Sequence, residues 1–267
     1  MRQYISFFKL KFAVGLQYKT AAIAGLATQI FFGLVFISVY IAFYNSGDAN
    51  TGINLSQLVT YIWLGQAFFA MISLWHRDPE IMKMIKNGDI AYELCRPQNL
   101  YLMWFTRIFS AKLSAVTLRS IPLLMVAFIM PEPYNLQLPV SIFAFIMFLL
   151  TLVIASVLVT ALSTILYIIS FYSLDNQGIR GIYCSIGEIL SGQVVPLPLT
   201  PNILRIISTI LPFAYVSDFS FRIYCGNIVG EELVIGLIVQ IFWVFISLLI
   251  GKLATDGILK RVSVQGG

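Results

Sequence analysis

The chain alternates between long apolar runs and short polar segments, and the apolar runs set the first expectation. A helix needs ~20 apolar residues to cross the hydrocarbon of a bilayer. Runs of this kind predict six transmembrane helices, at 21–43, 55–75, 101–130, 140–172, 179–199 and 233–254. The fourth run is longer than a crossing requires, so we expect it to tilt or to extend past the bilayer.

Two further segments are helical in pattern but are not expected to cross. On a helix, residues 1–20 place a polar sector beside aromatic and aliphatic side chains, which predicts an interfacial helix. The alternative is a disordered tail, which the many aromatic residues disfavour. Residues 200–230 contain apolar runs that are too short, and the prolines around them break the helix. They predict a re-entrant pair of short helices that dips into the outer leaflet.

Lysine and arginine are distributed unevenly over the connections. With the N-terminus inside, the inner segments hold 12 of them and the outer segments hold only Arg205 and Arg222. Positive charge on the inner connections predicts both termini in the cytoplasm. The fold class expected is therefore an all-α integral membrane protein, with residues 1–267 forming a single domain.

Composition agrees with this class. The 267 residues are 59% hydrophobic and only 11% charged, whereas soluble domains carry about 25% charged residues. The net charge of +5 does not indicate nucleic-acid binding, because the basic residues flank apolar runs instead of forming a solvated patch. Three cysteines without a CxxC pair give no disulfide framework.

The polar segment 76–99 lies between the second and third predicted spans, on the cytoplasmic side. Within it, residues 77–86 predict a short helix, with Pro79 in its first turn and Gly88 beyond its end. Apolar side chains are mixed there with both signs of charge, which suits a protein partner better than anionic lipid. An ordinary solvated connector is the alternative.

Two motifs carry a resemblance to a known family. The first reads Ile85-Lys-Asn-Gly88-Asp89-Ile90-Ala-Tyr-Glu-Leu94-Cys-Arg96-Pro97, after the second span. The second reads Leu190-Ser-Gly192-Gln-Val-Val-Pro196-Leu, followed by Pro201 and by Leu211-Pro212-Phe. In their order and positions they resemble permeases of the type-2 ABC exporter family of bacteria, over nearly the whole chain. Cys95 departs from the aliphatic residue expected there.

The resemblance implies a transmembrane permease subunit of an ATP-driven exporter in the bacterial cytoplasmic membrane. Such a permease pairs with a second permease chain, as a homodimer or a heterodimer. Its cytoplasmic loop helix docks on a separate ABC ATPase subunit, which binds ATP and Mg²⁺. On this reading the ATPase-coupling residues are Arg77, Asp78, Glu80, Ile81, Lys83, Met84, Gly88, Asp89, Arg96 and Pro97. Asp89 or Arg96 is expected to hold the turn, by capping or by an ion pair.

The chain encodes no motor of its own. It contains no GxxxxGK[S/T] phosphate-binding motif, no nucleophile–base arrangement, and one histidine, His76, without a set of metal ligands around it. We therefore expect no catalytic residue, metal or cofactor in this chain.

Some polar residues fall inside the predicted spans, where a charge costs ~2.5–3.5 kcal/mol. Arg107 and Lys112 are expected to reach the cytoplasmic surface. Arg119, Glu188 and Gln193 are the candidate pathway or intramembrane polar residues. For Arg119 and Glu188, a mutual ion pair, pathway lining and interfacial placement all remain open. Interhelical hydrogen bonds are the expected role of Gln29, Gln66 and Gln240.

Two other functions compete with the exporter. A gradient-driven secondary transporter or channel predicts internal repeats, but the proline cluster occurs only in the second half. An integral membrane enzyme needs convergent catalytic residues, which the pattern does not show. The aromatic-rich, weakly charged interior suits an amphipathic substrate whose identity the sequence leaves open.

Overall fold

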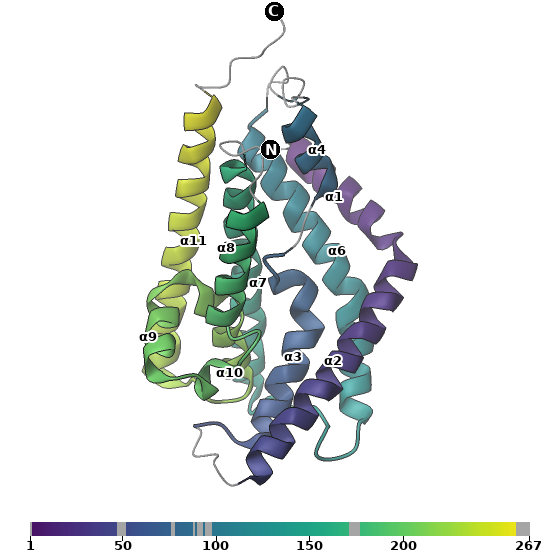
Figure 1. Ribbon diagram of the computed structural model, residues 1–267, viewed down its shortest axis with the longest axis vertical. Coiled ribbons are helices and arrows are strands. Elements are labelled where there is room, and N and C mark those ends of the chain that lie inside the picture. The colour runs from purple at the N-terminus through teal and green to yellow at the C-terminus, as the bar shows by residue number, and fades with distance from the viewer. Residues whose placement is uncertain are drawn as a thin grey trace, which may run out of the picture.

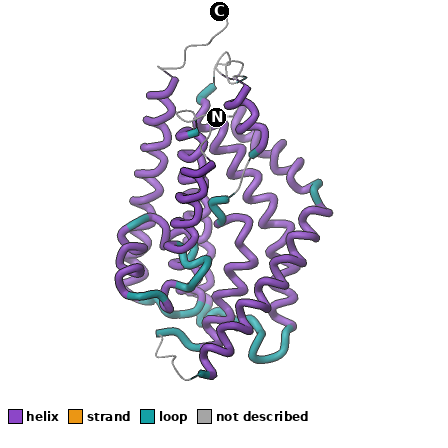
Figure 2. The backbone as a smooth tube through the Cα atoms, viewed as in Figure 1, coloured by secondary structure: helices purple, strands orange, loops and turns teal. Residues whose placement is uncertain are grey.

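The computed structural model describes residues 2–46, 52–75, 78–87, 89, 93, 98–170 and 177–259. These residues form helices joined by loops, and no strand occurs among them (Figure 2). The α-helices are α1 (Arg2–Leu16), α2 (Lys19–Asn45), α3 (Leu55–Ile72), α4 (Pro79–Asn87), α6 (Leu100–Ile129), α7 (Ile142–Ile169), α8 (Gln177–Leu190), α9 (Asn202–Ile210), α10 (Asp218–Tyr224) and α11 (Gly230–Leu259). Two 3₁₀ turns, η1 (Leu197–Leu199) and η2 (Pro212–Val216), flank α9.

Five helices of the described part are long and apolar enough to cross a membrane: α2, α3, α6, α7 and α11. Each overlaps one of the spans predicted from the apolar runs. The expectation of an all-helical, multi-pass membrane protein is confirmed by these helices. Their apolar side chains are compatible with lipid, and each helix makes its backbone hydrogen bonds internally, as a membrane-spanning segment requires.

The predicted span 179–199 differs from the structure. α8 has 14 residues, which corresponds to a length of about 21 Å and is too short for a straight crossing. It ends where Gly192 adopts a φ of 80°, and Pro196 and Pro198 stand in the turn that follows. A positive φ stops a helix, and proline cannot continue it. The helix is thus shorter than predicted, and the total of six spans stays a prediction.

The segment predicted to be re-entrant, 200–230, consists of short helices, as its broken apolar runs indicate. It contains α9, η2 and α10, which lie beside the lower half of α11 in Figure 1. Leu211 separates α9 from η2, which begins at Pro212. Entry of this segment into the outer leaflet stays a prediction.

The helices pack around α6, which contacts α1, α2, α3 and α7. α7 in turn packs against α10 and α11. The start of α1, the short helix α4 and the end of α11 lie at one end of the molecule (Figure 1). We assign that end to the cytoplasm as a prediction from the positive charges.

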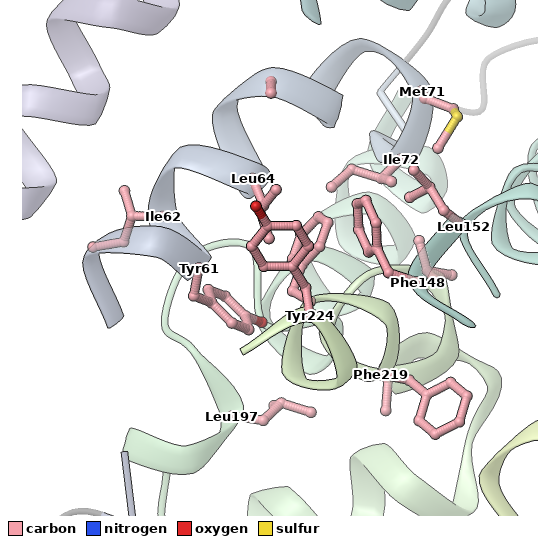
Figure 3. Packing of buried hydrophobic residues seen from close by; sticks show 14 of the residues in the cluster. Tyr61, Ile62, Leu64, Met71, Ile72, Phe148, Leu152, Leu197, Phe219 and Tyr224 are labelled. Atoms are coloured by element: carbon pink, nitrogen blue, oxygen red, sulfur yellow. The ribbon is translucent and has the colours of Figure 1, made fainter. Parts of the chain in front are cut away.

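An aromatic core joins α3, α7 and residues 200–230, which we call the outer segment after their predicted position (Figure 3). The ring of Phe148 lies 5.1 Å from that of Tyr224 and 5.7 Å from that of Phe68, both edge-to-face. Such pairs contribute about 0.5–1.5 kcal/mol each beyond the area that they bury. Gln240 of α11 donates to the carbonyl oxygens of Thr151 and Tyr215, both at 3.0 Å, as the prediction of interhelical hydrogen bonds required.

The predicted N-terminal helix is present as α1, which packs against α6. Ser110 of α6 donates to the carbonyl oxygen of Phe8 at 3.2 Å, and the ring of Phe8 lies 6.0 Å from that of Phe109. None of its residues is fully buried. Its position along a membrane surface stays a prediction.

Candidate functional site

The start of α4 is fixed by its own sequence. Asp78 accepts the backbone N–H groups of Glu80 at 2.9 Å and Ile81 at 3.3 Å through one carboxylate oxygen. This is the arrangement of a helix N-cap. Pro79 occupies the first helical position, where its missing N–H costs nothing. The predicted short helix is therefore confirmed, with Asp78 as its cap.

Two cations from other helices bind the acidic start of α4. Arg107 of α6 forms ion pairs with both Asp78 and Glu80, and Lys11 of α1 lies 3.4 Å from Glu80. We call Lys11, Asp78, Glu80 and Arg107 the clamp. Burial and the neighbouring Arg107 lower the pKa of Lys11. The clamp ties α4 to α1 and α6.

A second set of contacts connects the clamp to α7 and α8. The backbone N–H of Asp78 donates to the hydroxyl of Tyr167 at 2.6 Å, and Tyr167 is fully buried in α7. The guanidinium of Arg180 lies over the Tyr167 ring, 5.3 Å from its centroid. Arg180, on α8, also donates to the carbonyl oxygen of Trp75. Displacement of α4 would therefore act on four helices.

The faces of α4 have different surroundings. Ile81 is completely buried and packs in a cluster that includes Leu100, Trp104 and Ile108. Lys83 is exposed and Met84 is half-buried. The expectation that Ile81 faces a partner is therefore wrong: this side chain anchors α4 to its own membrane domain. Glu80 and Lys83 remain accessible to a docking protein.

The remaining predicted coupling residues flank α4. Asp89 accepts a hydrogen bond from the side-chain amide of Asn87 at 3.4 Å, so it holds the end of α4 locally. Arg77, Gly88, Arg96 and Pro97 lie outside the described residues. Their predicted roles stay predictions.

A cavity of about 220 Å³ lies between α2, α3, α8 and the outer segment. Its lining combines aromatic rings with a few polar groups: Phe36, Tyr40, Tyr61, Phe69, Phe221, Gln66, Glu188 and Gln193. Glu188 is the one ionisable carboxylate among these described lining residues. Gln193 donates to the carbonyl oxygen of Ile72 at 3.3 Å, while its own amide oxygen is buried without a hydrogen bond to any described residue. Two of the three candidate pathway residues therefore share one cavity.

Tyr61 connects this cavity to the outer segment. Its hydroxyl donates to Asp218 at 2.9 Å and lies 3.2 Å from the carbonyl oxygen of Gly192. Asp218 is also 3.7 Å from Arg222. Figure 3 shows Tyr61 pointing from α3 toward the outer segment. Sequence reasoning missed this contact, because Tyr61 and Asp218 are 157 positions apart.

Arg119 lies elsewhere. It lines a second cavity, which α1, α2 and α6 enclose, and it forms no ion pair with Glu188. An ion pair between these two residues, one of the expected alternatives, is therefore absent from the part of the chain described. Arg119 donates to the carbonyl oxygen of Ala21 at 3.5 Å.

Lys112 corrects another expectation. It does not extend to the cytoplasmic surface, since only 1% of it is exposed. Its ammonium group donates to the carbonyl oxygens of Met71 and Ser73 at the C-terminal end of α3, where helix carbonyls lack partners. Lys112 thereby joins α6 to the residues that lead into the polar segment.

The three glutamines have different roles. Gln240 makes the predicted interhelical bonds, whereas both side-chain polar atoms of buried Gln29 lack hydrogen bonds within the described residues. For Gln29 the prediction is wrong. Gln66 is one of the residues that line the first cavity, and its predicted hydrogen bond stays a prediction.

One comparison with known proteins gives a family. A family model described as "ABC-2 family transporter protein" matches residues 28–261. The matched range includes Asp78, Glu80 and Arg107 of the clamp. It also includes the residues of α3, α6 and α8 that line the two cavities. No curated protein matches the chain.

Proposed function

Because this chain belongs to the ABC-2 transporter family, we propose that it is the transmembrane permease subunit of an ATP-driven exporter. α4 is the helix that docks on a separate ABC ATPase subunit, and that subunit binds ATP and Mg²⁺. The observation that carries the proposal is the clamp, in which the largely buried Arg107 ties α4 to the membrane domain through ion pairs with Asp78 and Glu80.

The contacts of α4 support a path for the mechanical coupling. Closure of the ATPase subunits around ATP displaces the docked helix. Arg107 transmits this displacement to α6, and Tyr167 transmits it to α7. Ion pairs and packed side chains with more than one arrangement are the usual carriers of such coupling.

The substrate pathway includes the cavity that contains Glu188 and Gln193. Aromatic walls with few polar groups suit an amphipathic substrate. A second permease chain, identical or homologous, completes the pathway. Support for this partner comes from α8, where Ile179, Ile182, Ile186 and Ile189 are exposed along one stripe at helical spacing. The complex belongs to the bacterial cytoplasmic membrane.

Co-expression with an ATPase encoded beside the gene tests the proposal. We expect a stable complex that hydrolyses ATP. Substitution of the phosphate-binding lysine in the ATPase, with this chain unmodified, should abolish the hydrolysis. A secondary transporter makes the opposite prediction, since the chain alone in vesicles would accumulate substrate on an ion gradient. Gradient-driven uptake by the isolated chain would overturn the proposal.

A further inference from the structure

The second cavity is lined by residues of α1, α2 and α6 and by the start of α4. Figure 1 shows α1 and α2 meeting at an angle beside α6. The volume of the cavity is about 370 Å³. Three cations, Lys11, Arg107 and Arg119, line it together with the carboxylates of Asp78 and Glu80. We call it the elbow cavity. Its other walls are small or apolar, with Ala111, Ala115 and Leu118 on α6.

The charges of the elbow cavity are not balanced. Both carboxylates bind Arg107, and Glu80 also pairs with Lys11. Arg119 has no carboxylate partner in the described part of the chain, and its Nε is buried there without a hydrogen bond. A charge inside a membrane protein needs such a partner or marks a functional site. The guanidinium of Arg119 therefore lacks a counter-charge among the described residues, and an anion in the cavity would supply one.

Packing fixes the guanidinium of Arg119 at the start of α2. A Cβ on Gly25 would lie 2.6 Å from its central carbon, so glycine at this position leaves room for the side chain. The nearby carbonyl oxygen of Ala21 belongs to the first turn of α2, just after the polar sequence Gln17-Tyr18-Lys19-Thr20. Polar residues at the start of a span lie at the level of lipid headgroups. The cation thus lies at headgroup level.

The surroundings of the cavity favour a lipid over a soluble anion. Tyr18, which lines the cavity just before α2, is 64% exposed, and Ile23 in the first turns of α2 is 66% exposed, so an acyl chain can lie beside them. α2 also begins without a side-chain cap, and the first turn of a helix favours negative charge. Burial lowers the pKa of Lys11, and the neighbouring Arg107 lowers it further.

We propose that the elbow cavity binds the phosphate of an anionic phospholipid from the cytoplasmic leaflet, with Arg119 as its principal ligand and Lys11 as a second. The guanidinium donates two hydrogen bonds to phosphate oxygens, a geometry for which arginine is well suited. The site requires membrane insertion only, so it does not depend on the proposed exporter function.

Lipid retention by the purified chain tests the site. The protein is exchanged into nanodiscs that contain phosphatidylcholine with a minority of phosphatidylglycerol, and bound lipid is counted by native mass spectrometry. We expect Arg119→Gln to reduce retention of phosphatidylglycerol about tenfold, as removal of a charge-assisted contact does. Ala115→Leu should reduce it similarly by filling the cavity while keeping every charge. Lys252→Gln, at an exposed cation of α11, is the matched control and should change nothing.

Three results would overturn the proposal. The first is equal retention of both lipids by the unmodified chain. The second is full retention of phosphatidylglycerol by Ala115→Leu, a variant that keeps Arg119 and is expected to fold. The third is displacement of the lipid by millimolar inorganic phosphate, which would identify a site for soluble anions.

Discussion

Arg107 of α6 binds the carboxylate of Asp78, which caps the N-terminus of α4. The two residues are 29 positions apart in the chain. Both side chains are largely buried, with 13% and 10% of their surfaces exposed. One carboxylate oxygen therefore starts the helix while the other holds it to a membrane-spanning segment. The same residue defines α4 and attaches it.

Removal of Arg107 should release α4 from the membrane domain. Loss of one partner leaves a buried charge uncompensated, so we expect Arg107→Ala to lower the free energy of unfolding by about 3 kcal/mol. Lys11→Ala is the matched control, because its pair with Glu80 is exposed at the carboxylate and such pairs contribute less than about 1 kcal/mol. Unfolding in mixed detergent micelles measures both. Equal effects of the two variants would contradict a central role of Arg107.

The two faces of α4 should respond differently to substitution. Lys83→Glu reverses an exposed charge, so we expect it to weaken ATPase association about tenfold while changing stability by less than about 0.5 kcal/mol. Ile81→Ala empties a buried position and should cost about 2–5 kcal/mol of stability. Co-purification with the ATPase and thermal unfolding separate these effects. Undiminished association of the Lys83→Glu variant would remove this face from the docking surface.

Gly192 is required where α8 turns into the outer segment. Its φ of 80° is unfavourable for other residues, and a Cβ there would lie 2.4 Å from the hydroxyl oxygen of Tyr61. We expect Gly192→Ala to destabilise the protein by about 1–3 kcal/mol. Gly181→Ala is the control within α8, since nothing lies within 4 Å of its Cβ position and alanine favours a helix by up to about 1 kcal/mol. Melting temperatures should move in opposite directions.

Asp218, in α10 and outside the predicted spans, should make stability depend on pH. Burial raises the pKa of Asp218 from 3.8 to about 6, although Arg222 and Tyr61 oppose the shift. The folded state therefore binds this proton more tightly than the unfolded state. Its contribution to stability is complete below about pH 4 and is lost as the pH rises through 6.

Comparison with Asp218→Asn isolates this contribution. Relative to that variant, the unmodified chain should lose on the order of 2–3 kcal/mol between pH 4 and pH 7. Glu231→Gln, at an exposed carboxylate, serves as the control. Parallel stability curves for the unmodified chain and Asp218→Asn would show that Asp218 titrates normally.

Hydropathy alone located the five long helices, because continuous apolar sequence has few alternatives to crossing a bilayer. It overestimated the length of the helix in the predicted span 179–199, where α8 ends at Leu190. Leu190 to Leu199 is apolar enough to continue a helix, but the φ of Gly192 and the prolines after it end the helix at Leu190. The apolar content of a segment does not reveal which backbone conformation its residues adopt, so hydropathy could not locate this helix end.

The candidate site around α4 could be predicted only where residues adjacent in sequence determine the local structure. The order Asp78-Pro79-Glu80 encodes the start of α4, and the short helix followed from it. The partners of Asp78 could not be found in the same way, since Arg107 and Tyr167 reach it from other helices. Burial of Lys112 likewise depends on where α3 ends against α6.

Glu188 should determine which charge of ligand the α2–α3–α8 cavity accepts. It is the one charged group among the described lining residues, and the aromatic rings around it add favourable contacts for a cation. We expect Glu188→Gln to weaken binding of ethidium, an aromatic cation, about tenfold, with little effect on a neutral dye of similar size. Glu231→Gln should leave both affinities unchanged, because that carboxylate is exposed at the start of α11. Fluorescence titration of the purified chain measures each affinity, and an equal loss for both dyes would assign Glu188 to the structure of the cavity instead of its charge preference.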